Sequence, residues 1–300
     1  MKIAIIGTSE ITNKHIDALK NYKKNIFSIS STRKNSKNLL KFKKKYKIKK
    51  IYKNWKEGIQ NAKRVKNLAF FITSRVEDNK KILEECCKTN KKIFIEKPIF
   101  DKPEDFKYFT KYKKQIFVGY NRIFYSGIKY LKKNLKLNNI ANVIVKCPEK
   151  NYKQIIRNSC HIISVLFFLF GSLTIVKKIK RKKFINFTLR NKNNIQINLF
   201  FNISNSSNFS VEINENTKRY SISPIENLRI FNGFKILKNK VGNIYLPKKI
   251  KEFNEYKENK YKPGFEIQFK EFIKFFKGKK IYNDIIFAKR IVDLSNKLVS

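Results

Sequence analysis

Hydrophobic residues in the first 120 positions fall into short runs that alternate with longer, more polar segments of helical period. Short apolar runs bounded by polar turns are typical of buried strands. The predicted strands are residues 2–6, 25–30, 48–52, 67–73, 92–95 and 115–119. Because strands and helices alternate repeatedly, we expect a parallel, doubly wound sheet with right-handed crossovers.

The segment 37–46 illustrates the helical pattern. Leu39, Phe42 and Tyr46 recur at helical spacing, and lysines occupy the opposite face. The segment overlaps the most basic stretch of the chain, residues 41–50, in which seven of ten residues are Lys. We interpret this stretch as a solvated helix face that leads into a strand, rather than as a site for a polyanion.

The pattern changes after residue 140, where strands alternate polar and apolar positions. Strands are predicted at 184–190 and 195–203, around an Asn-rich turn, and 210–213 is expected to pair with 218–223. Such hairpins indicate an antiparallel sheet. Helices are predicted at 156–170, 265–276 and 285–298.

These patterns predict an α/β protein of two domains. Residues 1–120 are expected to form the doubly wound parallel sheet, with a dinucleotide site at its carboxyl edge. Residues 121–300 are expected to form an α+β domain with a mostly antiparallel sheet.

The composition is strongly basic, with a formal net charge of +47 and a pI of about 10.1. Lys accounts for 59 of the 69 basic residues, although Arg is preferred for recognising phosphates and bases. Lys, Ile, Asn, Phe and Tyr, all encoded by A/T-rich codons, make up more than half of the chain. We therefore attribute the charge mainly to base composition and do not expect a nucleic-acid partner. A nucleic-acid or anionic-membrane site at 41–50 and 176–183 would rest on charge alone.

Cysteine usage and hydrophobicity place the chain among cytoplasmic proteins. The four cysteines show neither CxxC nor Cys/His spacing, so no metal site is expected, and they are interpreted as buried, reduced thiols. The longest apolar stretch, residues 162–170, is about half the length of a membrane span. The amino terminus lacks the features of a signal peptide.

The first strand is followed by Gly7, Thr8, Ser9, Glu10 and Ile11, at the position of a dinucleotide-binding turn. Only the first glycine of the GxGxxG pattern is present. Ser9 stands at the second, where a side chain is expected to crowd the approach of a phosphate.

The end of the second strand bears on the choice of cofactor. An NAD-binding fold usually places Asp or Glu here to hold the ribose hydroxyls. Residues 30–34 contain no acid but include Ser31, Thr32 and Arg33. Hydroxyl groups followed by Arg suit a 2'-phosphate, so we expect NADP in preference to NAD.

Glu96, Lys97 and Pro98 end the fifth strand and are expected to face the ligand crevice of a parallel sheet. Glu and Pro are scarce in this composition, so their presence here is informative. A lysine at this position can hold a substrate hydroxyl and support proton transfer.

Six segments in this order resemble the glucose-fructose oxidoreductase and inositol dehydrogenase-like (Gfo/Idh/MocA) oxidoreductases. The segments are KIAIIGTSEITNKHIDAL, IEKP, VGYNRIF, RNSCHIISVLFFLFG, SPIENLRIFNGF and YKPGFEIQFKEFIKFFKG. The resemblance implies a Rossmann domain and a sheet domain that mediates homo-oligomerisation. It also implies hydride transfer between a nicotinamide cofactor and a hydroxyl of a sugar, cyclitol or sugar nucleotide.

The resemblance also implies roles for individual residues. Lys97 is expected to touch nicotinamide and substrate, with a cis Lys97–Pro98 bond, and His161 to act as general acid/base. The cofactor is expected to contact the turn residues Gly7 to Ile11 together with Ser31, Thr32, Arg33, Thr73, Ser74, Glu96 and Lys97. The substrate is expected to contact Asn121, Arg122, Arg157 and Asn158.

The chain also departs from the family pattern. Dehydrogenases of the family commonly carry Asp four residues before the histidine and often another three residues after it; here these positions are Arg157 and Ser164. Relatives from surface-polysaccharide pathways share the RNS-x-H helix start, and an arginine there could clamp a substrate carboxylate or phosphate. The alternative is a catalytically silent relative that binds a nucleotide or sugar as a scaffold or regulator.

Overall fold

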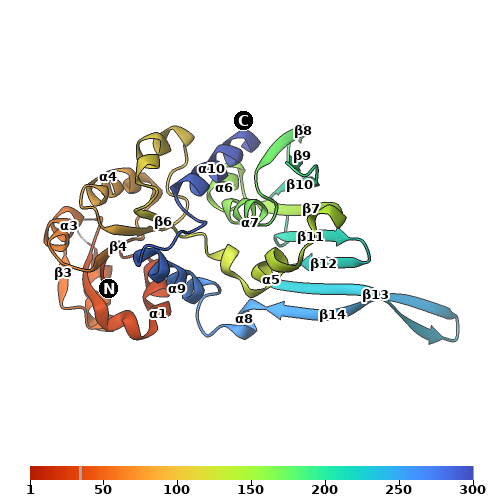
Figure 1. Ribbon diagram of the computed structural model, residues 1–300, viewed down its shortest axis with the longest axis horizontal. Helices are drawn as coiled ribbons and strands as arrows, with labels where there is room; N and C mark the ends of the chain where they lie inside the picture. The colour runs from red at the N-terminus through yellow and green to blue at the C-terminus, as the bar shows by residue number, and fades with distance from the viewer. Residues whose placement is uncertain (34–35, 300) are drawn as a thin grey trace. The chain divides into compact units, whose positions relative to one another are not determined.

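The computed structural model describes residues 1–33 and 36–299 and divides into two compact units (Figure 1). The first unit contains Met1–Asn121 and also Phe265–Lys297, and the second consists mainly of Arg122–Gly264. The sequence analysis had assigned all of 121–300 to the second domain. The structure corrects this boundary, because the segment that follows Gly264 folds mainly with the first unit.

The first unit is built on a six-stranded parallel sheet in the order β3-β2-β1-β4-β5-β6. This is the strand order of a dinucleotide-binding Rossmann fold, and it confirms the doubly wound parallel sheet. Its strands are β1 (Lys2–Ile6), β2 (Ile26–Ser30), β3 (Lys50–Tyr52), β4 (Leu68–Ile72), β5 (Lys92–Ile95) and β6 (Ile116–Val118).

Helices follow most of these strands. They are α1 (Glu10–Ala18), α2 (Lys37–Tyr46), α3 (Trp55–Lys63), α4 (Val76–Cys87) and the 3₁₀ helices η1 (Lys20–Asn25) and η2 (Pro103–Tyr112). In α2, Leu39 and Phe42 are buried and the lysines are exposed, which confirms the solvated basic face.

Aromatic packing explains why the carboxyl-terminal helices, α9 (Phe265–Phe276) and most of α10 (Ile285–Val299), join the first unit. Phe272 of α9 packs edge-on against Phe71, Phe94 and Phe117 of β4, β5 and β6, with ring centroids 5.0–5.8 Å apart. Burying these rings on the sheet is strongly favourable. The periodicity of α9 predicts a helix but does not indicate which sheet it covers.

The second unit contains an eight-stranded sheet in the order β14-β13-β12-β11-β7-β10-β9-β8. All neighbouring strands are antiparallel except the pair β7 and β10, so the prediction of a mostly antiparallel sheet is confirmed. The strands are β7 (Ile140–Glu149), β8 (Leu173–Arg181), β9 (Phe184–Asn191), β10 (Gln196–Ile203), β11 (Ser210–Glu215), β12 (Lys218–Ile222), β13 (Asn227–Asn239) and β14 (Gly242–Asn254).

The predicted hairpins are present as β9–β10 and β11–β12. The prediction of one helix at 156–170 is wrong, since two helices, α6 (Tyr152–Arg157) and α7 (Cys160–Phe170), meet at Asn158 and Ser159. The physical reason is that the side chains of both residues bond to Glu149 at the end of β7, which stabilises a turn. The other helical elements are α5 (Ser126–Asn134), α8 (Glu255–Glu258), η3 (Asn121–Phe124) and η4 (Leu137–Asn139).

Strands β13 and β14 extend as a two-stranded arm beyond the other strands of their sheet (Figure 1). Exposed apolar side chains lie along the arm: Phe234, Ile236, Leu237, Val241, Ile244, Tyr245 and Ile250. Within the described residues, no helix combines the length and apolar character needed to cross a membrane.

Candidate functional site

The turn after β1 has a conformation that requires glycine. Gly7 has φ of +124°, and a Cβ atom there would lie 2.6 Å from Thr73 Oγ1 and 2.7 Å from the Thr73 carbonyl oxygen. The Gly7 N–H donates to the Ser30 carbonyl at 2.9 Å, so the turn is held between β2 and β4. The backbone thus passes closely over the ends of two strands, directly before the amino terminus of α1.

Ser9 is held by protein groups rather than projecting freely from the turn. Its hydroxyl donates to the Thr73 carbonyl at 3.2 Å and lies 3.2 Å from Thr12 Oγ1. Thr12 Oγ1 is in turn 2.8 Å from Thr73 Oγ1. These bonds attach the first turn of α1 to β4. Thr8, Glu10 and Ile11 complete this turn, and Thr8 Oγ1 lies 3.0 Å from Ser36 Oγ.

At the end of β2, Ser31 builds a local turn that presents an arginine. Its buried hydroxyl accepts the Arg33 backbone N–H at 3.0 Å and donates to the Arg33 carbonyl at 2.9 Å. Thr32 is half-buried, whereas Arg33 is exposed. Of the three residues predicted here, Arg33 is therefore the one whose side chain is accessible to a ligand.

A hollow of about 330 Å³ lies beside the glycine turn, between the first turns of α1 and helix α2. Its lining includes Thr8, Ser9 and Asn38, and it has two lysines, Lys41 and Lys45, against one acid, Glu10. The amino terminus of a helix attracts anions, and lysines add positive charge. The hollow can therefore accept a phosphate-bearing group.

Thr73 and Ser74 follow β4 directly, as the sequence predicts. Thr73 is buried and bonded to Thr12, and the Ser74 hydroxyl donates to Asn79 Oδ1 at 2.6 Å. The two residues occupy the carboxyl edge of the sheet next to the glycine turn. Their hydroxyl groups also bond to the helices on either side of that edge.

The segment after β5 is anchored by a histidine that the sequence analysis did not assign. His15 Nε2 on α1 donates to Glu96 Oε1, and the backbone N–H of Lys97 donates to Glu96 Oε2 at 3.0 Å. The His15 ring stacks on Phe265 at 4.3 Å and meets Phe94 edge-on at 5.0 Å. Because both side chains of the pair are mostly buried, His15 fixes the carboxylate that precedes Lys97.

Opposing effects act on the Glu96 carboxyl. Burial raises its pKa, but the hydrogen bond and charge of His15, together with the charge and N–H of Lys97, lower it below its ordinary value. Glu96 is therefore a stable carboxylate in a mostly buried position. The Lys97–Pro98 peptide bond is cis, which confirms the expectation drawn from the family resemblance.

Strand β6 approaches this segment closely. A Cβ atom at Gly119 would lie 3.3 Å from the Glu96 Cα atom, so a small residue is needed there. Asn121, predicted to face substrate, is buried two residues later. The candidate residues of the first unit thus gather at the carboxyl ends of neighbouring strands, where ligands bind in doubly wound sheets.

The remaining candidates belong to the second unit. Arg122 lies 3.7 Å from the Glu226 carboxylate and 5.7 Å from the centre of the Phe209 ring. Arg157 and Asn158 end α6, and His161 is the second residue of α7. Arg157, Asn158 and His161 are each half-buried, so the helix start brings them together at one partly accessible turn.

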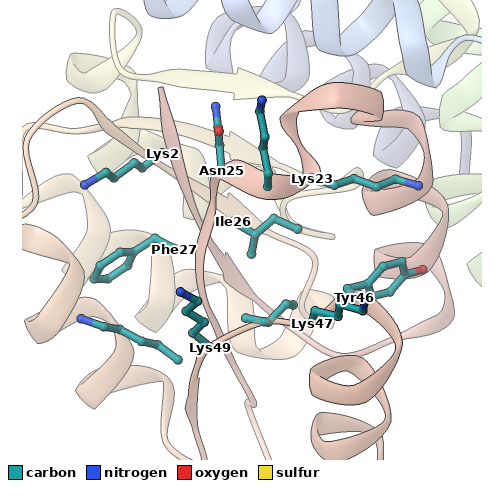
Figure 2. Close-up of a pocket in the computed structure, with 11 residues that line it drawn as sticks. Lys2, Lys23, Asn25, Ile26, Phe27, Tyr46, Lys47 and Lys49 are labelled. Carbon is teal, nitrogen blue, oxygen red and sulfur yellow. The ribbon is translucent and has the colours of Figure 1, made fainter.

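A larger hollow of about 770 Å³ lies at the opposite edge of the parallel sheet, at the amino ends of β1, β2 and β3. None of its described lining residues is acidic, and six are Lys. Figure 2 shows the side chains of Lys2 and Lys23 pointing to opposite sides, with Lys49 lower in the view. Because these ammonium groups diverge, the hollow fits the solvated basic surface inferred for 41–50 better than a site for one small anion.

Comparison with protein families assigns this fold. Residues 1–120 match the Gfo/Idh/MocA family model, described as an oxidoreductase family with an NAD-binding Rossmann fold. Residues 1–120 are thus similar to the NAD-binding domain of this oxidoreductase family. This match indicates an NAD(P)-dependent oxidoreductase.

Solved structures share the fold over the whole chain. A dehydrogenase from Clostridium difficile is 19% identical with a TM-score of 0.75, covering 100% of this chain and 98% of that one. The UDP-N-acetylglucosamine 3-dehydrogenase of Acidithiobacillus ferrooxidans is 10% identical with a TM-score of 0.75, covering 99% and 95%. The scyllo-inositol dehydrogenase of Lactobacillus casei is 15% identical with a TM-score of 0.73, covering 100% and 95%. No curated protein matches the sequence.

The contacts of two carboxylates, Glu96 with His15 and Glu149 with the α6–α7 turn, were not predicted. His15 could have been found, since it is one of two histidines and lies on the buried face of α1 beside Thr12 and Ile16. Glu149 follows a Pro within an irregularly alternating segment, and no motif identifies it.

Proposed function

We propose that the chain transfers hydride between NADP(H) and a hydroxyl-bearing carbon of a sugar or sugar nucleotide. The observation that carries the proposal is the clustering of three features at one edge of the parallel sheet. The first is the Gly7 turn with its positive φ, and the second is the Ser31–Arg33 turn, which contains no acidic residue. The third is the Glu96–Lys97 segment, which His15 anchors.

The residues present fit a dinucleotide. Gly7 leaves the space that a Cβ would fill, and the turn leads into the amino terminus of α1, where backbone N–H groups favour a pyrophosphate. Gly7, Thr8, Ser9, Glu10 and Ile11 would hold the pyrophosphate, with Thr73 and Ser74 beside it. When bound, the nicotinamide ring would supply or accept the hydride.

Two side chains would act on the hydroxyl group of the substrate. In the oxidative direction His161 takes the hydroxyl proton, and the Lys97 ammonium stabilises the negative charge that develops on oxygen. Glu96 would keep the Lys97 backbone in place through its bond to the Lys97 N–H. Asn121, Arg122, Arg157 and Asn158 would orient the substrate.

The preference for NADP rests on the exposed Arg33 and on the hollow beside the turn. An Asp or Glu at the end of β2 would repel a 2'-phosphate, whereas Arg33, Lys41 and Lys45 would attract one. We expect calorimetry to give a lower Kd for NADPH than for NADH. Arg33→Asp should reverse that order, and an unchanged order in this variant would contradict the assignment.

A phosphate-bearing substrate is favoured by Arg157, which stands where relatives carry Asp. Guanidinium groups bind phosphates and carboxylates in a bidentate manner. A sugar nucleotide of surface-polysaccharide metabolism fits this chemistry, and one structure of the same fold is a UDP-N-acetylglucosamine 3-dehydrogenase.

Four buried cysteines, none in a disulfide, support a cytoplasmic location.

We also propose that the chain forms a homo-oligomer through its second-unit sheet. The arm of β13 and β14 exposes Phe234, Val241 and Tyr245 to solvent by 68%, 96% and 61% of their surface. A two-stranded hairpin is marginally stable alone in water, so such an arm is expected to be covered. Light scattering after gel filtration should give a multiple of 35.8 kDa, and a monomer at micromolar concentration would contradict this.

The catalytic proposal is tested with purified protein, NADP and a panel of sugars and sugar nucleotides. His161→Ala should lower the rate by about 10²- to 10⁴-fold, because it removes the general base. Equal rates for parent and variant would refute this mechanism. NADPH binding with no turnover of any panel member would instead favour the catalytically silent alternative.

A further inference from the structure

Glu149 is a buried carboxylate at the end of β7, the central strand between β10 and β11. It is 5% exposed, and its backbone carbonyl accepts the Ser204 N–H at 2.7 Å. Strand β7 pairs along most of its length with both neighbours. The carboxylate therefore projects from a rigid part of the second unit.

Both oxygens of this carboxylate bond to the turn between α6 and α7. The Ser159 hydroxyl donates to Glu149 Oε1, and Asn158 Nδ2 donates to Glu149 Oε2 at 3.2 Å. Two successive residues are thus held by one side chain from another element. Since Ser159 is fully buried, water does not compete for its hydroxyl.

The turn held by Glu149 leads directly to His161. The backbone N–H of His161 donates to the Asn158 carbonyl at 3.1 Å, and that of Ile163 donates to the Ser159 carbonyl at 3.0 Å. The Ser164 hydroxyl donates to the His161 carbonyl at 2.6 Å. Short contacts therefore connect the Glu149 carboxylate to the backbone that carries the imidazole.

Electrostatics favours the same arrangement. Helix α7 has 11 residues, and a carboxylate beside its amino terminus interacts favourably with the helix dipole. Glu149 brings a carboxylate from β7 to this turn.

We propose that Glu149 is a positioning residue for His161, fixing the start of α7 and placing a negative charge beside its amino terminus. The proposal rests on the proposed function only for its catalytic consequence. The contact itself can be tested without a substrate, because the chain has only two histidines.

The decisive experiment is an NMR titration of the histidine ring protons in the whole protein, with His161→Ala and His15→Gln used for assignment. Glu149→Gln removes the charge at nearly constant volume. It should shift the His161 signal and lower the His161 pKa, because a nearby carboxylate favours the imidazolium form. Arg157 ends α6, and the charge of Arg122 acts on Cys147, two residues before Glu149; both arginines are kept unchanged in the comparison. The His15 signal should not move.

Glu212→Gln is the matched control. Glu212 on β11 accepts the Ser221 hydroxyl at 2.5 Å, so it is also a Ser–Glu pair of the same sheet, and no hydrogen bond joins it to the α6–α7 turn among the described residues. A His161 signal that responds equally to both substitutions, or to neither, would overturn the proposal. If Glu149→Gln does not fold, Ser159→Ala removes the other side of the bond and should likewise shift the His161 signal.

The catalytic consequence is measured as a double-mutant cycle. With the best substrate of the panel, Glu149→Gln should lower kcat about tenfold in the parent and leave the residual kcat of His161→Ala unchanged, because both act through the same imidazole. An equal fold-loss of kcat from Glu149→Gln in the parent and in His161→Ala would indicate a merely structural role and overturn the proposal. If the NMR shift occurs but His161→Ala retains the parent rate, the contact stands and the proposed function fails.

Discussion

The two units each hold a mostly buried carboxylate at the end of a strand, next to a candidate catalytic residue. In the first unit Glu96 is bonded by His15 of α1 and by the N–H of Lys97, the residue that follows it. In the second unit Glu149 is bonded by Asn158 and Ser159, which precede His161. The first carboxylate has an ionisable partner, whereas these two partners of the second are neutral.

This difference teaches how each carboxylate is stabilised in its own unit. The bond between His15 and Glu96 depends on charge and on pH, whereas the bonds that Asn158 and Ser159 donate to Glu149 depend mainly on geometry. The Glu96 contact is also connected to the Gly7 turn, since His15 lies on α1, the helix that follows this turn. We therefore expect substitutions at these positions in the first unit to have larger effects than substitutions in the second unit.

The largest effect is expected from Gly7→Val. The side chain would overlap Thr73, and φ of +124° strains any residue with a Cβ by about 1–3 kcal/mol. NADPH binding should fall below detection by calorimetry. Gly242→Ala is the control, because it has φ of +146° but no atom within 4 Å of its Cβ, and it should bind like the parent. Normal binding by Gly7→Val would contradict the assigned turn.

A smaller effect is expected from His15→Ala. It leaves the Glu96 carboxylate mostly buried without its imidazole partner and removes the stacking on Phe265, at a cost of about 3 kcal/mol. Ser159→Ala in the second unit removes a neutral donor and should cost about 1–2 kcal/mol. Urea denaturation measures both free energies of unfolding. A larger loss of stability in Ser159→Ala than in His15→Ala would show that charge does not distinguish the two carboxylate contacts.

The smallest effect is expected in the pH dependence of the stability that the Glu96–His15 pair contributes. Because the folded-state pKa of Glu96 is lowered, its ionisation stabilises the fold above its unfolded pKa of about 4.5. This stability is lost as the pH falls through the lower folded value. The stability difference between the parent and Glu96→Gln should therefore narrow below about pH 4.5. A difference that stays constant down to the acid unfolding transition would contradict the lowered pKa.

Much of the first unit could be predicted because its strands and helices are determined by the pattern of their own residues. Strands β1 and β5 and helix α2 begin and end where their hydrophobic patterns predict, and Glu96–Lys97–Pro98 forms a recognisable segment. The contact between His15 and Glu96 was missed, because 81 positions separate its two residues and only the fold brings them together.

The second unit was harder to predict for the same physical reason. The apolar pattern at 156–170 continues through Ser159, so only the bond from Glu149 shows where the helix is interrupted. Helix α9 was placed in the wrong domain because its phenylalanines would suit the core of either sheet. Whether the site residues of the two units act together stays a prediction.

The central claim is that the Gly7 turn and the Arg33 turn bind a phosphorylated nicotinamide dinucleotide. Calorimetric titration of the purified chain with NADPH and then with NADH tests it most directly, without a known substrate. We predict one NADPH per chain with a lower Kd than NADH. Absence of binding by both dinucleotides would contradict the account.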